Sequence, residues 1–410
     1  MSLTLPLPAR KDRPPHCVII VENLPVPFDR RVWQEANALK EAGWEVSVIC
    51  PRNAQHPQSY EKIDGIAIHR HSLPVEARGK LGFLLEYGCA LFHETRLLLK
   101  IALTRGFDVV QGCNPPDLIF LVAAPYKLFG KKYVFDHHDL CPELYAAKYG
   151  RHGFFHRLLL LAEKCTFKFA DRVISANETY RDIAIERGGK APERVTTVYS
   201  VPDRQKLRRV APDAQLRAGA GVILGYVGII ADQDGVDHLV RMMHHIVCEG
   251  GRHGVRAVVV GDGPALASVR ELATSLDVAE HVVFTGYLRG EALLAALSTF
   301  DIGIIPDPVN EYNDKISMNK VFEYSALGIP SVSYDLSETR RLLGAAGSFA
   351  KDATPRGLAE AALPLIDDKE RRRHLGSEAG KLAEAKFNWT SEAEKYVAAY
   401  ADLVPERAYA

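Results

Sequence analysis

The chain of 410 residues is longer than one ordinary hydrophobic core supports, so we expect two domains. It is 47% hydrophobic and 25% charged, which excludes a disordered chain, and its 51 basic residues balance 51 acidic ones, which leaves no overall field to attract nucleic acid. The seven cysteines are scattered without CxxC spacing, which predicts a reducing compartment with neither disulfides nor a zinc site.

Targeting and membrane signals are weak. Residues 1–15 have the composition of a loose tail and lack the apolar centre of a signal peptide. The longest apolar stretch, 81–103, is interrupted by charged residues such as Glu86 and Lys100, so it does not read as a bilayer span. We therefore expect a cytoplasmic protein that rests at most on the inner face of a membrane.

Strands and helices alternate through the first half. A strand at 16–22, a Pro-rich loop at 23–28, a helix capped by Asp29 that runs to Gly43 and a strand at 45–50 form the first unit. Further strands are predicted at 66–71, 108–111, 132–136, 172–175 and 195–199, with helices at 80–104 and from Pro116. This alternation is typical of a parallel sheet covered on both faces.

The pattern restarts at residue 221. Strands are predicted at 221–227, 255–260, 282–285, 302–305 and 331–334, and helices at 235–247 and 264–276. A further helix carries Glu323 and ends at Gly328, with Ser317 or Asn319 as its N-cap, and the residues from 354 onward are helical, with Trp389 as an anchor. We predict an α/β fold of two doubly wound Rossmann-like domains that face each other across a cleft: 1–203, 204–385, and a C-terminal helix, 386–410, that crosses back to the first domain.

Chemistry-capable residues follow the predicted strands. Asp136, His137, His138 and Asp139 come at the end of the strand at 132–136 and suit either a base with an orienting carboxylate or a hold on a hydroxyl group. The alternative is a structural histidine satisfied by a neighbour. A metal site is less well supported, because no second group of ligands stands at a recognisable spacing.

A second candidate site lies in the other half. The start of the Glu323 helix offers backbone amides and a positive dipole to an anion, while a carboxylate one turn later suits a sugar diol. Glycine-bearing turns at 225–228, 261–263 and 286 allow close approach of a phosphate. The alternative is a surface helix with one solvated glutamate, together with the glycines that any α/β fold uses in its turns.

Taken together, these segments resemble the glycosyltransferases of family 4, which are retaining enzymes with the GT-B fold that use nucleotide-activated sugars. The resemblance covers nearly the whole chain and is carried by FDRRVWQEANALKEAGWEVSVIC, DHHDLCPEL, GYVGIIADQDGVDHLV, VVVGDGP, VVFTGYL, SMNKVFEYSALGIPSV and FNWTSEAEKYVAAY. Gln233 and Gly235 fit the G-x-x-x-x-Q-x-G turn of a branch met in surface-polysaccharide pathways.

The resemblance implies roles for individual residues. His138 is implied as the catalytic histidine beside the donor sugar, with Asp139 orienting it. Glu323 would hold the ribose, Lys320 and the amides around Gly228 would face the diphosphate, and Tyr287 would lie near the base. The implied donor-binding set is Gly228, Ile229, Gln233, Gly263, Tyr287, Lys315, Asn319, Lys320 and Glu323, and the implied acceptor-binding set is Pro27, Phe28, Asp29 and Arg30.

Three features depart from the family pattern. Lys315 stands where the first of the paired glutamates is expected. Ile229 and Asp234 replace an arginine and a lysine that commonly clamp the diphosphate, and the N-terminal loop reads PVPFDRR where a glycine-rich turn is commoner. The loss of each charged hydrogen bond weakens diphosphate binding by about 1.5–3 kcal/mol, unless Lys315 or Lys320 supplies a replacement.

The resulting hypothesis is a retaining transferase that moves a sugar from a nucleotide-sugar donor to a glycan or lipid-linked saccharide in cell-surface polysaccharide synthesis. It would need no metal and no cofactor, because the nucleotide sugar is a substrate, and no nucleic acid partner is expected. Peripheral membrane contact through 80–105 and 151–168 is a hypothesis; core-facing helices with solvated charges are the alternative. The competing functions are an epimerase or phosphorylase on the same architecture, and a catalytically silent GT-B protein that binds nucleotide or glycan as a partner subunit.

Overall fold

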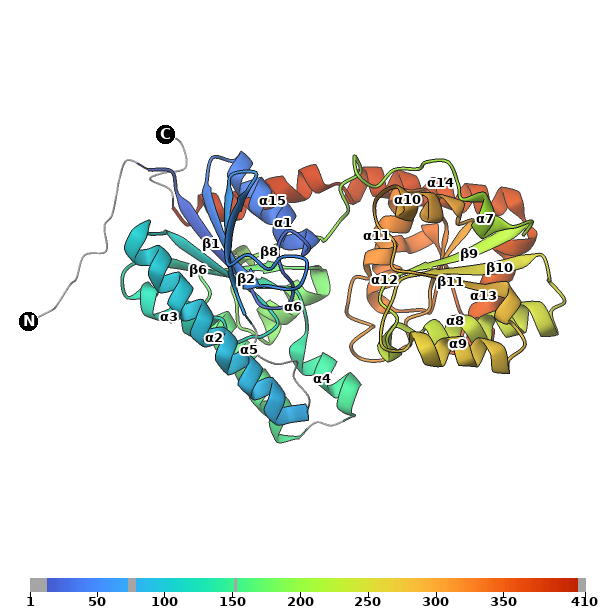
Figure 1. Ribbon diagram of the computed structural model, residues 1–410, viewed down its shortest axis with the longest axis horizontal. Helices are drawn as coiled ribbons and strands as arrows, with labels where there is room; N and C mark the ends of the chain where they lie inside the picture. The colour runs from blue at the N-terminus through green and yellow to red at the C-terminus, as the bar shows by residue number, and fades with distance from the viewer. Residues whose placement is uncertain (1–12, 73–78, 151–152, 405–410) are drawn as a thin grey trace, which may run out of the picture. The chain divides into compact units, whose positions relative to one another are not determined.

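The computed structural model describes residues 13–72, 79–150 and 153–404, and these form two α/β units (Figure 1). The first unit extends to Ser200 and takes in the chain again from Thr390, whereas the second is the continuous segment Val201–Trp389. Most of the tail predicted at residues 1–15 lies outside the described residues. No helix within the described ranges has the length and apolar character that crossing a bilayer requires.

The first unit is built on an eight-stranded sheet in the order β3-β4-β2-β1-β5-β6-β7-β8. All neighbouring strands are parallel except β3 and β4. The strands are β1 (His16–Val21), β2 (Glu45–Pro51), β3 (Tyr60–Ile63), β4 (Ile66–His71), β5 (Val109–Cys113), β6 (Lys132–His137), β7 (Arg172–Ser175) and β8 (Val195–Thr197). The central strand β1 is buried along its whole length, as expected where helices cover both faces of a parallel sheet.

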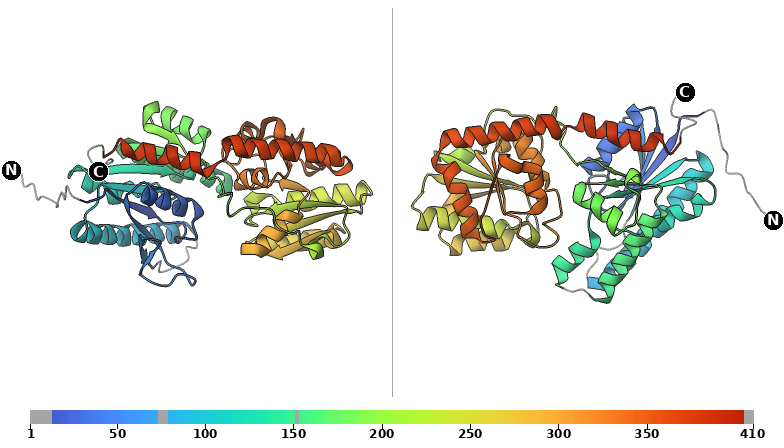
Figure 2. Two further views of the ribbon diagram at one scale, coloured as in Figure 1. Left: turned by 90° about the horizontal axis from the view of Figure 1, so that it is seen from above. Right: turned by 180° about the vertical axis from the view of Figure 1, so that it is seen from behind.

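The helices of this unit cover the two faces of the sheet. They are α1 (Arg30–Glu41), α2 (Gly79–Thr104), α3 (Phe120–Lys127), α4 (Cys141–Tyr149), α5 (Phe154–Phe169), α6 (Glu178–Glu186) and α15 (Trp389–Ala401). Side chains of α2, α3 and α5 share a core with Val18, Ile20 and Val110. On the other face of the sheet, the ring of Tyr400 in α15 packs edge-on against Trp44. Figure 2 shows α15 in red alongside the first unit.

The second unit has a six-stranded parallel sheet in the order β11-β10-β9-β12-β13-β14. The strands are β9 (Val222–Val227), β10 (Val255–Val260), β11 (Val282–Gly286), β12 (Ile302–Ile305), β13 (Ser331–Ser333) and β14 (Gly347–Phe349). The chain order reverses between β9 and β12, which is the point where doubly wound sheets bind ligands beyond their carboxyl ends.

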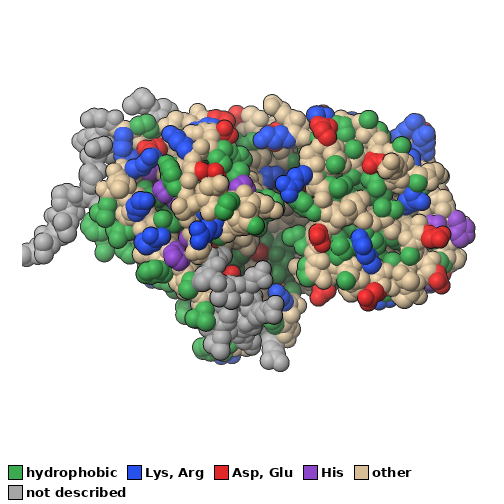
Figure 3. Space-filling view, viewed as in Figure 1, with side chains coloured by type: hydrophobic (Ala, Val, Ile, Leu, Met, Phe, Trp, Pro, Cys, Tyr) green, Lys and Arg blue, Asp and Glu red, His purple; other side chains and the backbone are tan. Residues whose placement is uncertain are grey.

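Helices α7 to α14 complete the second unit. They are α7 (Ala214–Arg217), α8 (Val236–His244), α9 (Leu266–Ser275), α10 (Gly290–Thr299), α11 (Asn319–Ala326), α12 (Ser337–Leu343), α13 (Pro355–Asp367) and α14 (Lys369–Lys386). On the face shown in Figure 3, acidic and basic side chains are interspersed over this unit, in keeping with a formal net charge of zero.

The caps predicted for the helix ends were only partly correct. Asp29 caps α1 as predicted, because its carboxylate accepts a hydrogen bond from the Val32 amide at 3.0 Å. The N-cap predicted for α11 is wrong: Met318 occupies that position and supplies no side-chain cap. The Ser317 hydroxyl instead donates to Glu338 at 3.1 Å. Gly328 follows the helix at φ +62°, the left-handed conformation that favours glycine at this position.

Candidate functional site

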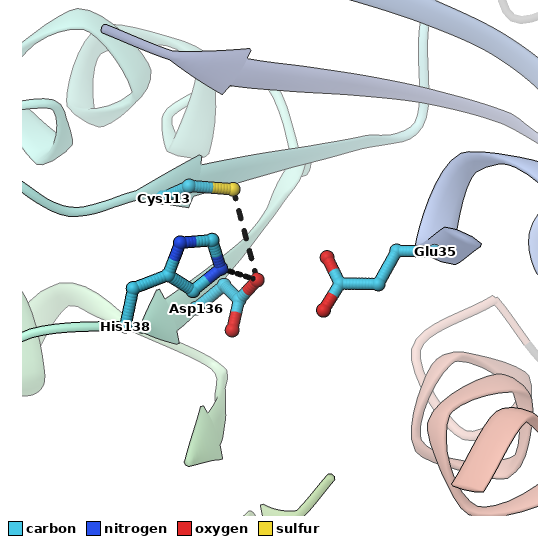
Figure 4. A group of neighbouring side chains, drawn as sticks. All are labelled: Glu35, Cys113, Asp136 and His138. Atoms are coloured by element: carbon cyan, nitrogen blue, oxygen red, sulfur yellow. Dashed lines mark hydrogen bonds and ion pairs between the residues drawn. The ribbon is translucent and has the colours of Figure 1, made fainter. Parts of the chain in front are cut away.

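The candidate catalytic histidine lies just beyond the carboxyl end of β6. His138 Nε2 is 2.5 Å from Asp136 Oδ2, and Asp136 is completely buried (Figure 4). The sequence predicted Asp139 as the orienting acid, but the structure pairs His138 with Asp136. In extended backbone, residues two apart share a face and adjacent residues do not. A carboxylate oxygen of Asp139 accepts a hydrogen bond from the Leu140 amide at 2.9 Å.

Asn114 fixes the backbone that carries His138. Its side-chain oxygen accepts hydrogen bonds from the amides of His138 at 2.6 Å and Asp139 at 3.1 Å. Its side-chain nitrogen donates to Asp117 at 2.8 Å and to the Asp139 carbonyl at 2.7 Å. The helix predicted from Pro116 therefore begins later, at Phe120, because Asn114 and Asp117 form a turn first.

Asp136 is held as a carboxylate by further donors, which are Arg31, Gln111 and the thiol of Cys113. Arg31 donates to its Oδ1 at 2.8 Å and Gln111 donates to its Oδ2 at 3.1 Å. Burial disfavours the charge, but Arg31 and His138 outweigh it and hold the pKa of Asp136 well below its ordinary value. In the neutral tautomer that donates its Nε2–H to this carboxylate, Nδ1 of His138 carries the lone pair that accepts a hydrogen bond.

Glu35 completes this buried group. Its side chain pairs with Arg31 at 3.0 Å and accepts a hydrogen bond from Gln111 at 2.8 Å. Burial and the charge of Asp136 raise the pKa of Glu35 well above its ordinary value, although the charge of Arg31 opposes this shift. The signal for this network was present in FDRRVWQEA, where Arg31 and Glu35 stand four apart on the buried face of one helix.

The same side chains converge closely enough to raise the question of a metal. Glu35, Cys113, Asp136 and His138 bring their ligand atoms within 4.8 Å of one another (Figure 4). Asp136 already accepts from Arg31 and Gln111, and the arginine would repel a cation. Burial raises the pKa of the Cys113 thiol well above its usual value, which disfavours the thiolate that binds metals. These residues do not fit a metal site.

The loop predicted to bind the acceptor has both structural and outward side chains. Its backbone is fixed by Arg70, which donates to the Val26 carbonyl at 2.6 Å, and Asp29 is used as the cap of α1. Pro27 is half-buried, whereas Phe28 and Arg30 are exposed. Phe28 and Arg30 are thus the members of the predicted acceptor set that face solvent.

In the second unit, Lys320 is a buried member of the predicted donor set. Its Nζ lies 3.1 Å from a carboxylate oxygen of Asp307 and 5.0 Å from the centre of the Tyr226 ring. Asp307 follows β12 at the same edge of the sheet. Burial raises the pKa of Asp307, although the charge of Lys320 opposes this shift. Lys320 therefore forms a buried ion pair with Asp307 at this edge of the sheet.

The glycine-bearing turns pack tightly against one another. Gly261 has φ +143°, and a Cβ there would lie 1.8 Å from the Gly228 carbonyl oxygen. A Cβ on Gly263 would lie 2.3 Å from the Ile230 carbonyl oxygen, and the Ile230 amide donates to the Asp262 carbonyl at 3.0 Å. Close packing of the loops after β9 and β10 thus accounts for Gly261 and Gly263 without a ligand.

The remaining predicted donor residues surround this edge. Ile229 and Tyr287 follow β9 and β11 and are 66% and 55% exposed. Gln233 and Asn319 are exposed, and Glu323 is half-buried one turn into α11. Lys315, the residue in place of the expected first glutamate, pairs with Glu311 at 2.9 Å. The predicted site residues fall into two groups, one in each unit.

Comparison with known proteins identifies the family. A model described as "Glycosyl transferase 4-like domain" matches residues 29–200, and a model described as "Glycosyl transferases group 1" matches residues 221–368. The chain belongs to the family 4 glycosyltransferases. Each model matches one half of the chain, and the two doubly wound sheets are those of the GT-B fold.

Curated glycosyltransferases are distant relatives of the chain. An alpha-D-kanosaminyltransferase from Streptomyces kanamyceticus is 24% identical over 59% of this chain, and a 2-deoxystreptamine N-acetyl-D-glucosaminyltransferase from Streptomyces fradiae is 27% identical over 53% of it. The matches span 63% and 52% of those two proteins. A GDP-mannose-dependent alpha-mannosyltransferase from Mycolicibacterium smegmatis is 25% identical over 74% of this chain and 75% of that protein.

Solved structures share the fold of this chain at low identity. Sucrose-phosphate synthase from Thermosynechococcus elongatus superposes with a TM-score of 0.77 at 17% identity, over 95% of this chain and 99% of that one. WaaG, described as a glycosyltransferase involved in lipopolysaccharide biosynthesis, superposes with a TM-score of 0.68 at 16% identity, over 93% and 98% of the two chains.

Proposed function

We propose that this protein transfers a sugar, with retention of configuration, from a nucleotide-sugar donor to a glycan or lipid-linked saccharide in cell-surface polysaccharide synthesis. The observation that carries the proposal is a family match to both halves of the chain combined with His138 held by a buried carboxylate. The named relatives support the donor class, since one is GDP-mannose-dependent and HepE from Anabaena was solved with UDP and glucose. WaaG supports the surface-polysaccharide role.

In the proposed reaction His138 contacts the donor sugar. Asp136 fixes the ring so that Nδ1 accepts a hydrogen bond from a sugar hydroxyl, and the buried carboxylate stabilises positive charge that develops nearby. The amide end of α11 and the ammonium of Lys320 would stabilise the departing diphosphate, and Glu323 would accept hydrogen bonds from the ribose. The acceptor hydroxyl attacks from the face that the diphosphate leaves. No metal at the reacting atoms is required in this scheme.

A lipid-linked acceptor is supported by the surface of the first unit. Phe154, Leu158 and Leu161 are exposed on α5, and its exposed charges are Arg157, Lys164 and Lys168. The acid of this helix, Glu163, is buried and pairs with Arg187. On α2 the exposed apolar side chains Leu85, Phe92, Leu99 and Leu103 recur at sevens and fours, which places them on one helical face. Figure 3 shows apolar side chains on this unit with Lys and Arg among them.

An apolar face with a basic border suits an anionic membrane surface. We expect the protein to co-sediment with vesicles that contain anionic lipid, to bind neutral vesicles weakly, and to be released by salt. Leu158→Glu should reduce this binding several-fold, whereas Leu216→Glu, a change on the other unit, should not. Absence of salt-sensitive binding to anionic vesicles would remove the membrane part of the proposal and leave transfer itself untouched.

The test of transfer begins with the donor. A thermal-shift screen of nucleotide sugars identifies the ligand that raises the melting temperature, because a ligand that binds only the folded state stabilises it. With that donor, titration calorimetry of Glu323→Gln should show affinity lowered at least 10-fold, while the exposed Glu360→Gln on α13 should bind as the parent protein does. Unchanged affinity in Glu323→Gln would refute the donor site.

Turnover separates the competing functions. Slow release of nucleoside diphosphate from labelled donor without acceptor, abolished by His138→Ala, supports a transferase. Binding without turnover supports the silent GT-B protein. The observation in favour of this alternative is that Lys315 pairs with Glu311 and Lys320 with Asp307, so both lysines already have partners within the protein. Conversion of the donor to an epimer, or phosphorolysis of a glycan, would replace the proposal with one of the other two enzymes.

A further inference from the structure

Three buried side chains of the first unit converge near the carboxyl ends of two strands. Glu22 directly follows β1, His71 is the last residue of β4, and Glu94 lies in α2. They are 5%, 3% and 1% exposed, and one ligand atom from each lies within 4.8 Å of the others. Because they come from three separate segments, no ligand spacing in the sequence reveals them.

Within the described part of the chain, this group draws few partners from outside itself. The carboxyl groups of Glu22 and Glu94 lie against each other, and apart from the Ser72 backbone beside the His71 ring, no described residue outside the group hydrogen-bonds to these side chains. The two histidine-to-acid atoms that approach most closely, His71 Nε2 and Glu22 Oε2, are 3.4 Å apart, longer than the 2.7–2.9 Å of a charged hydrogen bond. A buried, unpaired polar group costs free energy unless something binds it.

The spacing fits two ligands of one cation. Ligands about 2.0–2.1 Å from a tetrahedral zinc ion lie about 3.3–3.4 Å from each other, which matches the separation of His71 Nε2 and Glu22 Oε2. One imidazole with two carboxylates is a ligand set that zinc accepts, whereas magnesium prefers oxygen alone. Two carboxylates also match the charge of a divalent ion. The carboxylate of Asp136 is less suited to a cation, because it already accepts hydrogen bonds from Arg31 and Gln111.

We propose that Glu22, His71 and Glu94 bind a divalent transition-metal ion of the zinc class, with water in the fourth position. The ion ties α2 to the ends of β1 and β4. None of these three side chains has a role in the transfer proposed above, so the zinc titration and the transfer assay are read separately.

The experiment uses the full chain after removal of metal by a chelator. Calorimetric titration with zinc chloride should show about one tight site per chain, and cobalt should give the visible absorption of a tetrahedral nitrogen and oxygen site. His244 and His245 lie near Glu249 on the second unit and offer a competing surface site. The titrations are therefore performed in a His244→Asn, His245→Asn background.

Matched variants on one helix decide the result. Glu94→Gln should weaken zinc binding at least 10-fold and abolish the cobalt spectrum, while Glu86→Gln, a less buried acid of α2, should retain both. Zinc should raise the melting temperature of the parent protein but not of Glu94→Gln. If Glu94→Gln does not fold, His71→Asn takes its place. Equal zinc affinity in Glu94→Gln and Glu86→Gln, or no tight site in the parent protein, would overturn the proposal.

Discussion

Tyr396 in α15 donates a hydrogen bond of 2.6 Å to the side-chain oxygen of Gln111 in β5, 285 residues earlier in the chain. Tyr400, one turn further along α15, donates to the same oxygen. The amide nitrogen of Gln111 donates in turn to Glu35 and to Asp136, the partner of His138. The last helix therefore supports the candidate catalytic histidine through a short chain of buried hydrogen bonds.

Loss of the hydrogen bond between Tyr396 and Gln111 should lower the free energy of unfolding. Tyr396→Phe removes one buried donor while Tyr400 still satisfies Gln111, so we expect the free energy of unfolding to fall by about 1 kcal/mol. Urea unfolding measures it, and Tyr60→Phe, at the exposed edge strand β3, should leave the midpoint unchanged. An unchanged midpoint for Tyr396→Phe would mean that this hydrogen bond contributes no net stability.

Variants of Asp136 and Asp139 test which of the two acids orients His138. Asp136→Asn removes the charge that fixes His138, and we expect turnover to fall by about 100-fold or more with a small change in donor affinity. Asp139→Asn should lower turnover much less, because Asp136 still orients the ring. Steady-state kinetics on both variants, after circular dichroism confirms folding, decides between them. The opposite order of effects would restore Asp139 as the orienting residue.

Lys320 and Asp307 should be strongly coupled. Lys320→Met leaves a buried carboxylate without its cation, so we expect a loss of about 3–5 kcal/mol in the unfolding free energy. The double variant Lys320→Met, Asp307→Leu removes both charges and should recover most of that loss. A double-mutant cycle by urea unfolding measures the coupling, and additive effects would show that the pair is not coupled.

His137 should make the protein sensitive to acid. Burial lowers the pKa of His137 from its ordinary 6.5 to about 3, and its ring is packed among Phe135, Phe167 and Tyr180. Between these two values the unfolded chain binds a proton that the folded chain does not, so stability falls as the pH falls. The loss is about 1.4 kcal/mol per pH unit below 6.5, or about 2 kcal/mol at pH 5.

His137→Phe should remove this contribution. The difference in unfolding free energy between variant and parent is then expected to change by about 2 kcal/mol in favour of the variant between pH 7 and pH 5. The exposed His253→Gln is the control, and its difference from the parent should stay constant. A constant difference for His137→Phe as well would show that the buried ring takes up a proton in the folded state.

Much of the fold was predictable because buried parallel strands are short apolar runs. The predicted bounds of β7, β10 and β12 coincide with the observed ones. Strands β3 and β14 were missed, since no residue of either is fully buried and a polar strand at the edge of a sheet has no apolar run to reveal it. The facing of the two domains across a cleft stays a prediction.

Only those site residues that are marked by their immediate sequence neighbours could be predicted. His138 was found from its place after a strand, but its partner depends on the direction in which extended side chains point. Arg31 and Glu35 were quoted within a motif without a role. The contact of Gln111 with Tyr396 joins opposite ends of the chain, and a single sequence carries no signal for such pairing. Glu22, His71 and Glu94 were missed for the same reason.

The placement of α15 has a consequence for biosynthesis. The second unit is continuous in the chain, so it can fold as it leaves the ribosome, whereas the first unit lacks α15 until the whole of the second unit has been made. Gln111 thus meets its tyrosine partners only after the second unit has been synthesised. A nascent chain that stalls within the second unit would expose the uncovered face of the first sheet to chaperones and proteases, which makes synthesis of α15 a checkpoint for the unit begun first.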